Sequence, residues 1–309
     1  MGRDRGASVR VSTRVGRGVK RPEAARRRGL LGCLRRGTLF VCRRPMFPSR
    51  VRQKLTAREP VICAKSSYLH PEIVEMLCTF GFDGIWLCLE HKRIDPSEVA
   101  SLIQACRLRG VDAIMRVKPA NYTDVLWLLE TGARGIMLPR VRDVAEVREV
   151  VAMMKFPPVG RRGYDGVQPE AGFGRMAPAD YIAEANRDTF LVVQIEEVDV
   201  VPQIDAIAAT PGVDVLFVGP SDLTLGMGRF GRTEDPEVQA ILREVVAACE
   251  RHGKTAGIPC AVEQVDAYRR MGFRFLNVIS DYRCLSVGLR KVQADLAAQG
   301  LDLRAPFAP

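Results

Sequence analysis

The sequence predicts an α/β protein with one large domain, a closed (β/α)8 barrel of the TIM type. Two observations carry this prediction. From residue 60 onward, short apolar runs alternate with amphipathic segments, and the runs number eight, which is the strand count of such a barrel. The runs also show no regular polar alternation, which is typical of parallel strands covered by helices.

The predicted strands are the β-rich stretches "PVICAK" (60–65), "GIWLCLE" (84–90), "DAIMRVK" (112–118), "GIMLPRV" (135–141), "LVVQIEE" (191–197), "DVLFVGP" (214–220), "KTAGIP" (254–259) and "FRFLNVIS" (273–280). A doubly wound open sheet is the alternative arrangement. No G-x-G-x-x-G motif follows the first stretch. This absence and the count of eight favour the closed barrel.

Helix signals lie between these stretches. "DPSEVASLIQACRLRG" (95–110) opens with Asp and Ser as capping residues and closes on Arg and Gly, as helices commonly do. One connection is much longer and contains the Gly-rich "VGRRGYDGVQPEAGFGR" (159–175). A long segment of this kind indicates a functional loop or lid, and a solvated insertion is the alternative.

Charge divides the chain near its N-terminal end. Residues 1–58 hold 18 Lys and Arg against two acids, whereas the remaining 251 residues hold 28 against 34. We predict a basic leader over residues 1–48 and the barrel over 49–309. The leader is expected to be disordered or to precede a true start at Met46. A targeting peptide and a nucleic-acid-binding arm are the alternatives.

Composition argues against several classes of protein. No apolar run approaches the roughly 18 residues that a membrane-spanning helix needs. The nine cysteines are scattered and form no C-x-x-C pair, as expected for free thiols in a reducing compartment. We therefore expect a cytoplasmic protein that has no membrane partner and whose barrel binds no nucleic acid.

Polar residues follow the predicted strands, at the end where barrels place their active sites. Glu196 and Asp222 end consecutive strands, so both are expected above the same part of the barrel. Two oxygen ligands with water or substrate suit Mg²⁺ or Mn²⁺, and ion pairs with nearby arginines are the alternative. Arg116 closes the third strand, where it can stabilise an oxyanion or form a salt bridge.

A turn and a histidine add to this candidate site. "VGPSDL" (218–223) leaves the N–H groups of Ser221 and Asp222 free after Gly219, and such groups bind carboxylate or phosphate oxygens. His91 follows the second strand, and an imidazole is a natural general base. A structural role is the alternative for His91.

The partner of that histidine is a separate question. Glu90 is its neighbour, but adjacent side chains of a strand point to opposite faces. Glu130, at the end of a predicted helix in "LLETG", is the other candidate.

Taken together, the motifs resemble the HpcH/HpaI family of metal-dependent pyruvate aldolases, within the phosphoenolpyruvate/pyruvate barrel superfamily. The likeness covers roughly residues 50–295 in one register. The matching motifs, in order, are "GFDGIWLCLEH", "MRV", "LLETGARGIMLPRV", "FPPVGRRG", "VVQIEE", "GVDVLFVGPSDL", "LGMGRFG" and "GFRFLNV".

The resemblance implies an aldehyde-lyase that cleaves a 2-keto-4-hydroxy acid to pyruvate and an aldehyde. It implies a divalent metal, Mg²⁺ or else Mn²⁺ or Co²⁺, held by Glu196 and Asp222, with Gln194 beside the first ligand. The metal would chelate the keto acid and help to stabilise an enolate. Decarboxylation or C–C bond formation by the same metal–enolate chemistry is the alternative, and a non-enzymatic barrel with an RNA-binding arm is a remote one.

The remaining roles come from the same resemblance. Arg116 corresponds to the residue that steadies the enolate oxygen, and the N–H groups of Ser221 and Asp222 to those that hold the pyruvate carboxylate. His91 corresponds to the base of a dyad, in which Glu130 stands where the family commonly has Asp.

The chain departs from the family pattern in places. Cys88 stands where an acidic residue often precedes the Glu-His pair. Lys92 and Arg93 follow that pair, and Pro259 with Cys260 ends the seventh strand, so we expect a different aldehyde half. The family also implies a homo-oligomer, a trimer or hexamer, with "CLSVGLRKVQADLAAQG" (284–300) as the exchanged helix.

Overall fold

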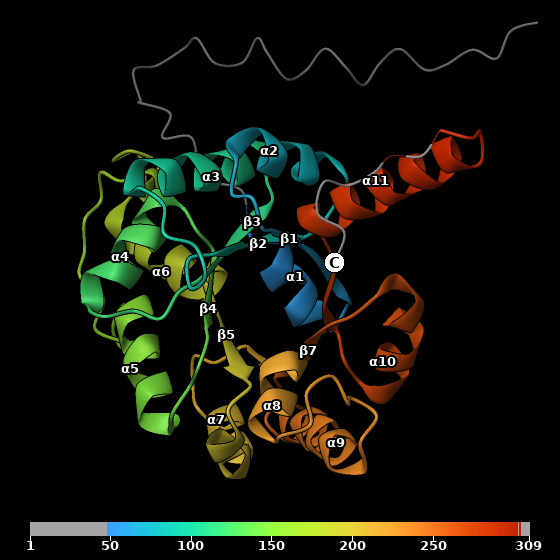
Figure 1. The fold of residues 1–309 in the computed structure, drawn as a ribbon. Coiled ribbons are helices and arrows are strands. Elements are labelled where there is room, and N and C mark those ends of the chain that lie inside the picture. Colours follow the sequence, from blue (N-terminus) through green and yellow to red (C-terminus); the bar gives the residue numbers. More distant parts are fainter. Residues whose placement is uncertain (1–47, 302, 304–309) are drawn as a thin grey trace, which may run out of the picture. The chain divides into compact units, whose positions relative to one another are not determined.

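The computed structural model of the protein describes residues 48–301 and Leu303. The predicted leader, apart from Pro48, therefore lies outside the described residues. Within them, eight parallel strands close into a barrel in chain order, and β8 pairs with β1 to complete it (Figure 1). The predicted strands and the barrel topology are confirmed.

The strands are β1 (Val61–Ser66), β2 (Gly84–Cys88), β3 (Asp112–Arg116), β4 (Gly135–Leu138), β5 (Phe190–Ile195), β6 (Val215–Val218), β7 (Thr255–Pro259) and β8 (Phe275–Ser280). The α-helices are α1 (Arg50–Ala57), α2 (Pro71–Thr79), α3 (Pro96–Arg109), α4 (Tyr122–Thr131), α5 (Val144–Met154), α6 (Pro178–Asp188), α7 (Ile204–Ala208), α8 (Pro220–Gly226), α9 (Pro236–Arg251), α10 (Val265–Met271) and α11 (Asp281–Ala297). Short 3₁₀ turns are η1 (Pro169–Ala171), η2 (Val198–Gln203) and η3 (Val262–Gln264). In the described part of the chain, no helix is long and apolar enough to span a bilayer.

Local sequence signals set the ends of the helices. At the start of α3 the Asp95 carboxylate accepts from the N–H of Ser97 at 2.8 Å, and Glu98 accepts from the N–H of Asp95 at 3.2 Å. This capping box satisfies N–H groups that have no partner inside the helix. The helix ends at Gly110, whose φ of 62° is the left-handed conformation that glycine adopts most easily.

Alternate residues of most strands fill the inside of the barrel. This inner cluster contains Val61, Cys63, Trp86, Ile114, Met137, Phe190, Val192, Val215, Phe217 and Phe275. Val51 and Leu55 of α1 pack against it, so α1 closes the amino-terminal end of the barrel. Asp112 at the start of β3 fixes this helix, because it accepts from Oγ of Ser49 at 2.6 Å and from the N–H of Val51 at 2.8 Å.

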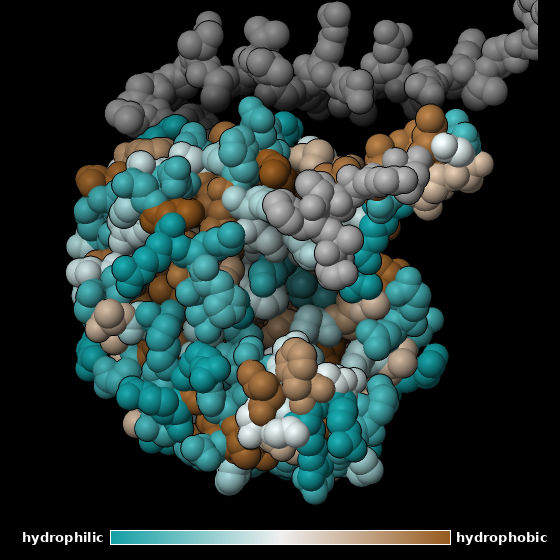
Figure 2. All heavy atoms as spheres, in the orientation of Figure 1, coloured by the Kyte–Doolittle hydropathy of each residue, from teal (hydrophilic) through white to brown (hydrophobic). Residues whose placement is uncertain are grey.

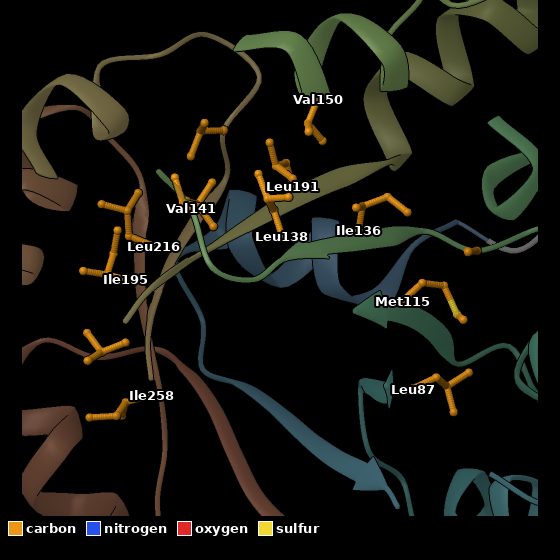
Figure 3. Close-up of a cluster of buried hydrophobic side chains, with 14 of the residues drawn as sticks. Leu87, Met115, Ile136, Leu138, Val141, Val150, Leu191, Ile195, Leu216 and Ile258 are labelled. Atoms are coloured by element: carbon orange, nitrogen blue, oxygen red, sulfur yellow. The ribbon is translucent and has the colours of Figure 1, made fainter. Parts of the chain in front are cut away.

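The other face of each strand packs against the surrounding helices. Figure 3 shows part of this larger cluster, with Ile136, Leu138 and Leu191 of neighbouring strands beside Val150 of α5. Both faces of the strands are thus covered by apolar side chains. This explains why the strands appear in the sequence as continuous apolar runs.

The Gly-rich segment 159–175 contains a buried ion pair. Arg162 pairs with Glu170 inside the segment, and both side chains are almost fully buried. Tyr181 of α6 donates to Glu170 at 2.8 Å, and the N–H of Gly163 donates to the hydroxyl of Tyr122 at 2.5 Å. The segment is therefore held against α4 and α6.

Candidate active site

The carboxyl ends of the strands carry polar side chains because the inward alternation continues past the apolar interior. Arg116 lies two residues after Ile114, and Gln194 lies two residues after Val192. These positions face a cavity of about 650 Å³ at this end of the barrel. Figure 2 shows the molecule hollowed at the centre of its ring of helices.

Most of the predicted site residues come together in this cavity. Those that line it are His91, Arg116, Gln194, Glu196, Gly219, Ser221 and Asp222. Glu130 is not in this lining. It lies on α4, half-buried, where burial raises the pKa of its carboxyl and the positive charge of Arg162 opposes the rise. The predicted dyad of His91 with Glu130 therefore stays a prediction.

Glu196 is the most tightly held carboxylate of the site. Its side chain is only 2% exposed. Oε1 accepts from the N–H of Arg140 at 2.7 Å, and Oε2 accepts from Nε2 of Gln194 at 3.1 Å. Arg140 has a φ of 50°, an uncommon left-handed value for a residue with a side chain. In this left-handed conformation the main-chain N–H of Arg140 donates to Glu196 and holds its carboxylate.

Gly219, at the end of β6, permits the close approach of that carboxylate. A Cβ at this position would lie 2.5 Å from Oε2 of Glu196 and 2.9 Å from its Cβ. Any larger residue would therefore push Glu196 out of its place. Pro220 follows and opens α8, so Ser221 and Asp222 stand in the first turn of that helix.

The electrostatics of Glu196 fit a cation. Burial raises the pKa of Glu196 to about 7, and the negative charges of Glu90 and Asp222 contribute to the rise. The carboxylates of Glu196 and Asp222 repel each other, and a hard divalent cation, which prefers oxygen ligands, would relieve this repulsion. The donor set of Glu196 and Asp222 therefore fits Mg²⁺ or Mn²⁺.

The protein donors alone do not complete a metal site. Across residues 48–301 and Leu303, no group of three or more His, Cys, Asp or Glu side chains is placed to hold a metal ion. Water or substrate oxygens would have to supply the remaining ligands, which is usual for Mg²⁺.

Arg116 is buried at the centre of the site and contacts several groups. Its Nε lies 3.1 Å from Oε2 of Glu90, and Nη2 donates to Sγ of Cys88 at 2.9 Å. The guanidinium also stands 4.8 Å from the ring centre of Trp86. The departure at Cys88 thus places a thiol, instead of a second carboxylate, against the arginine.

His91 lies at the rim of the cavity, with its side chain 63% exposed. Its Nε2 is 4.0 Å from Oε2 of Glu90. The expectation that Glu90 and His91 would point to opposite faces was wrong, because β2 already ends at Cys88 and the pleat does not extend to them. Glu90 therefore reaches toward both Arg116 and His91.

The lining residues that the sequence analysis missed include Lys65, Trp86 and Asn277. Lys65 lies two residues after the inward-facing Cys63, and Asn277 two residues after Phe275. The same alternation was the signal that could have identified them.

The predicted basic pair after the Glu-His motif lies elsewhere. Lys92 and Arg93 line a separate cavity of about 320 Å³ beside Trp127 of α4, and neither lines the main cavity. Pro259 and Cys260 do line it. Of the residues expected to alter the aldehyde half, only these two face the site.

Comparison with known proteins shows the family of the chain. The sequence model of the HpcH/HpaI aldolase/citrate lyase family matches residues 66–286. The chain belongs to this family. The resemblance seen in the sequence motifs is thereby confirmed, and so is the assignment to the lyases, the enzyme class of HpcH/HpaI aldolases.

Named relatives lie within the same family. The 5-keto-4-deoxy-D-glucarate aldolase of Shigella boydii serotype 18 is 34% identical over 239 residues, which cover 77% of this chain and 92% of the relative. That of Salmonella arizonae is 34% identical over 252 residues, covering 80% and 96%. The crystal structure of an HpcH/HpaI aldolase from Desulfitobacterium hafniense DCB-2 superposes with a TM-score of 0.74 at 28% identity, over 84% of this chain and 99% of that one.

Proposed function

We propose that this HpcH/HpaI family member is a divalent-metal-dependent aldolase that cleaves a 2-keto-4-hydroxy acid to pyruvate and an aldehyde. The observation that carries the proposal is the convergence of Glu196, Asp222, Arg116 and His91 on one cavity. The substrate class is supported by relatives named for a keto-deoxy sugar acid.

Glu196 and Asp222 are the proposed holders of the metal, which when bound acts as a Lewis acid toward the keto acid. Gln194 keeps Glu196 in place by donating to its carboxylate at 3.1 Å. Ser221 and Asp222 open α8 and offer main-chain N–H groups to the carboxylate of the pyruvate half, since the first N–H groups of a helix have no partner within it.

Arg116 and His91 are the proposed groups for the chemical step. When the C3–C4 bond breaks, negative charge develops on the keto oxygen, and the buried guanidinium of Arg116 can stabilise it. His91 removes the proton of the 4-hydroxyl, directly or through one water. Oε2 of Glu90 lies 4.0 Å from Nε2 of His91, so Glu90 is the carboxylate beside this proposed base.

The test is a pyruvate-release assay. Pyruvate is coupled to NADH oxidation by lactate dehydrogenase, with 5-keto-4-deoxy-D-glucarate as first substrate. EDTA should abolish release, and Mg²⁺, Mn²⁺ or Co²⁺ should restore it. Release that survives chelation and is trapped by borohydride would instead establish a lysine Schiff-base enzyme and overturn the proposal.

The proposal includes assembly as a homo-oligomer, a trimer or hexamer, formed through α11. This helix extends away from the barrel (Figure 1), and its exposed apolar residues include Leu285, Leu289 and Val292. We expect the double variant Leu285→Glu/Leu289→Glu to lower the mass measured by light scattering to that of one chain. An unchanged mass would exclude α11 as the contact.

We also propose a cytoplasmic location. All seven cysteines among the described residues are free, and six of them are buried. Free buried thiols are usual in proteins of a reducing compartment.

A further inference from the structure

The two sides of the cavity differ in charge. Glu196 and Asp222 follow β5 and β6, whereas Lys65, Trp86 and Asn277 come from β1, β2 and β8, which adjoin one another. In a closed barrel of eight strands, β1 and β5 lie on opposite sides. An extended substrate held at Glu196 would therefore present its far end to the side of Lys65.

Lys65 is the cation of this side of the cavity. Its Nζ stands 4.7 Å from the ring centre of Trp86, and no carboxylate of the described residues lies within ion-pair distance of it. Burial and then the neighbouring charge of Arg116 lower the pKa of Lys65, and the acidic groups of Cys88, Glu90 and Asp281 oppose part of this change. A partly buried ammonium of this kind costs free energy that a bound anion would offset.

Two buried polar atoms beside Lys65 also lack partners. Trp86 is 6% exposed and Asn277 is 8% exposed. Within the described residues, Nε1 of Trp86 and Oδ1 of Asn277 make no hydrogen bond. Buried polar atoms are almost always paired. An unpaired donor and an unpaired acceptor on one wall are suited to hydroxyl groups, which both donate and accept.

We propose that Lys65, Trp86 and Asn277 form the subsite for the aldehyde half of the substrate, and that Lys65 binds a carboxylate at its far end. The specificity determinant is then the charge at the end remote from the keto group. A hydroxylated chain between the two ends would meet Trp86 and Asn277. This inference rests on the proposed aldol cleavage, because the aldehyde half is defined by that reaction.

A terminal carboxylate fits this wall better than a terminal phosphate. Besides Lys65, the lysine and arginine residues in the cavity lining are Arg116, which is paired with Glu90, and Arg283 of α11, which is exposed. Phosphate sites usually combine several donors or a helix N-terminus with the cation. A single ammonium is enough for one carboxylate.

The test uses two substrates that differ in the charge of the far end. 5-Keto-4-deoxy-D-glucarate ends in a carboxylate, whereas 2-keto-3-deoxy-D-gluconate ends in a hydroxymethyl group. We expect Lys65→Met to lower kcat/KM for the diacid by about 30-fold or more, the usual loss for a desolvated charge pair, and to change that for the monoacid by less than about threefold. Lys65→Arg should recover part of the loss.

Lys118→Met is the matched control. Lys118 lies two residues beyond the end of β3 and pairs with Glu146 outside this cavity, so its loss should affect both substrates equally and slightly. An equal loss on both substrates in Lys65→Met would overturn the inference, as would no loss on either. 2-Keto-3-deoxy-6-phosphogluconate serves as a third substrate, with a phosphate at the far end. If Lys65→Met lowered kcat/KM for this substrate alone, phosphate and not carboxylate would be the bound group.

Two further measurements separate this inference from the proposed function. If the wild-type protein releases pyruvate from neither substrate, the aldolase proposal fails. Glycerate, which resembles the carboxylate-bearing aldehyde half, should still raise the melting temperature of wild type but not of Lys65→Met, with glycerol as the uncharged control. Absence of that shift would overturn the role of Lys65. A borohydride-reduced pyruvate adduct found on Lys65 by mass spectrometry would overturn it as well.

Discussion

Arg116 and Glu90 form an ion pair at the centre of the candidate site, with Nε of the guanidinium 3.1 Å from Oε2 of the carboxylate. We predict that Arg116→Lys lowers kcat for pyruvate release by about 100-fold or more, because a single preorganised donor to an oxyanion contributes about that much. KM should change less. Steady-state kinetics of Arg116→Lys would measure kcat and KM. Glu90→Gln, which keeps the guanidinium of Arg116, is the comparison. Unchanged kcat in Arg116→Lys would remove Arg116 from the chemical step.

Gly219 is predicted to be essential for the position of Glu196. In Gly219→Ala the new methyl group would meet Oε2 of Glu196 at 2.5 Å, so the carboxylate must move. We expect affinity for Mn²⁺ to fall by about 10-fold or more, the range for displaced metal-site support, as measured by calorimetry.

The control for this variant is Gly226→Ala at the last residue of α8, the helix that Gly219 precedes. Its Cβ would meet only a methyl group of Val198, at 3.1 Å, so Mn²⁺ affinity should stay near that of wild type. Equal affinities in both variants would contradict the proposed role of Glu196 as a ligand.

The ion pair of Arg162 and Glu170 provides a stability prediction. Glu170→Gln leaves a buried guanidinium without its counter-charge, which costs about 3–5 kcal/mol of unfolding free energy. The double variant Arg162→Met/Glu170→Leu removes both charges and should recover most of this loss. Urea denaturation followed by circular dichroism would test both. A single variant as stable as wild type would show that the segment 159–175 is not held by this pair.

Asp112 is predicted to make stability depend on pH. Burial raises the pKa of Asp112 to about 6, although the hydrogen bonds from Ser49 and Val51 oppose the rise. Because the unfolded value is about 3.9, the folded state favours the protonated form. Its contribution to stability is complete below pH 4 and is lost as the pH rises through 6.

The matched variant for this prediction is Asp112→Asn, which cannot titrate. Relative to it, wild type should lose on the order of 2 kcal/mol of unfolding free energy between pH 4.5 and 7.5. Denaturant titrations at both pH values would measure the difference. If wild type instead became more stable relative to Asp112→Asn at the higher pH, the raised pKa of Asp112 would be contradicted.

The sequence was sufficient for the barrel because its strands are buried on both faces and therefore stand out as apolar runs. Most of the site also followed, since Arg116, Glu196 and Asp222 lie at or just after the carboxyl ends of strands that converge at one end of the barrel. Lys65 and Asn277 were missed because they stand inside apolar stretches, where a polar residue at an inward position is not conspicuous. The relation of Glu90 to His91 could not be predicted, because it depends on where β2 ends.

The helix α1 has a practical consequence for trimming the chain. Val51 and Leu55 cover the apolar floor of the barrel, and Ser49 joins that helix to Asp112. A version starting at Met46 should match the full-length protein in turnover and melting temperature, and a large loss of either would show that residues 1–45 contribute to folding. A version starting at Pro60 would let water reach Phe190 and Phe275 from below, and we expect it to be recovered mainly as aggregate.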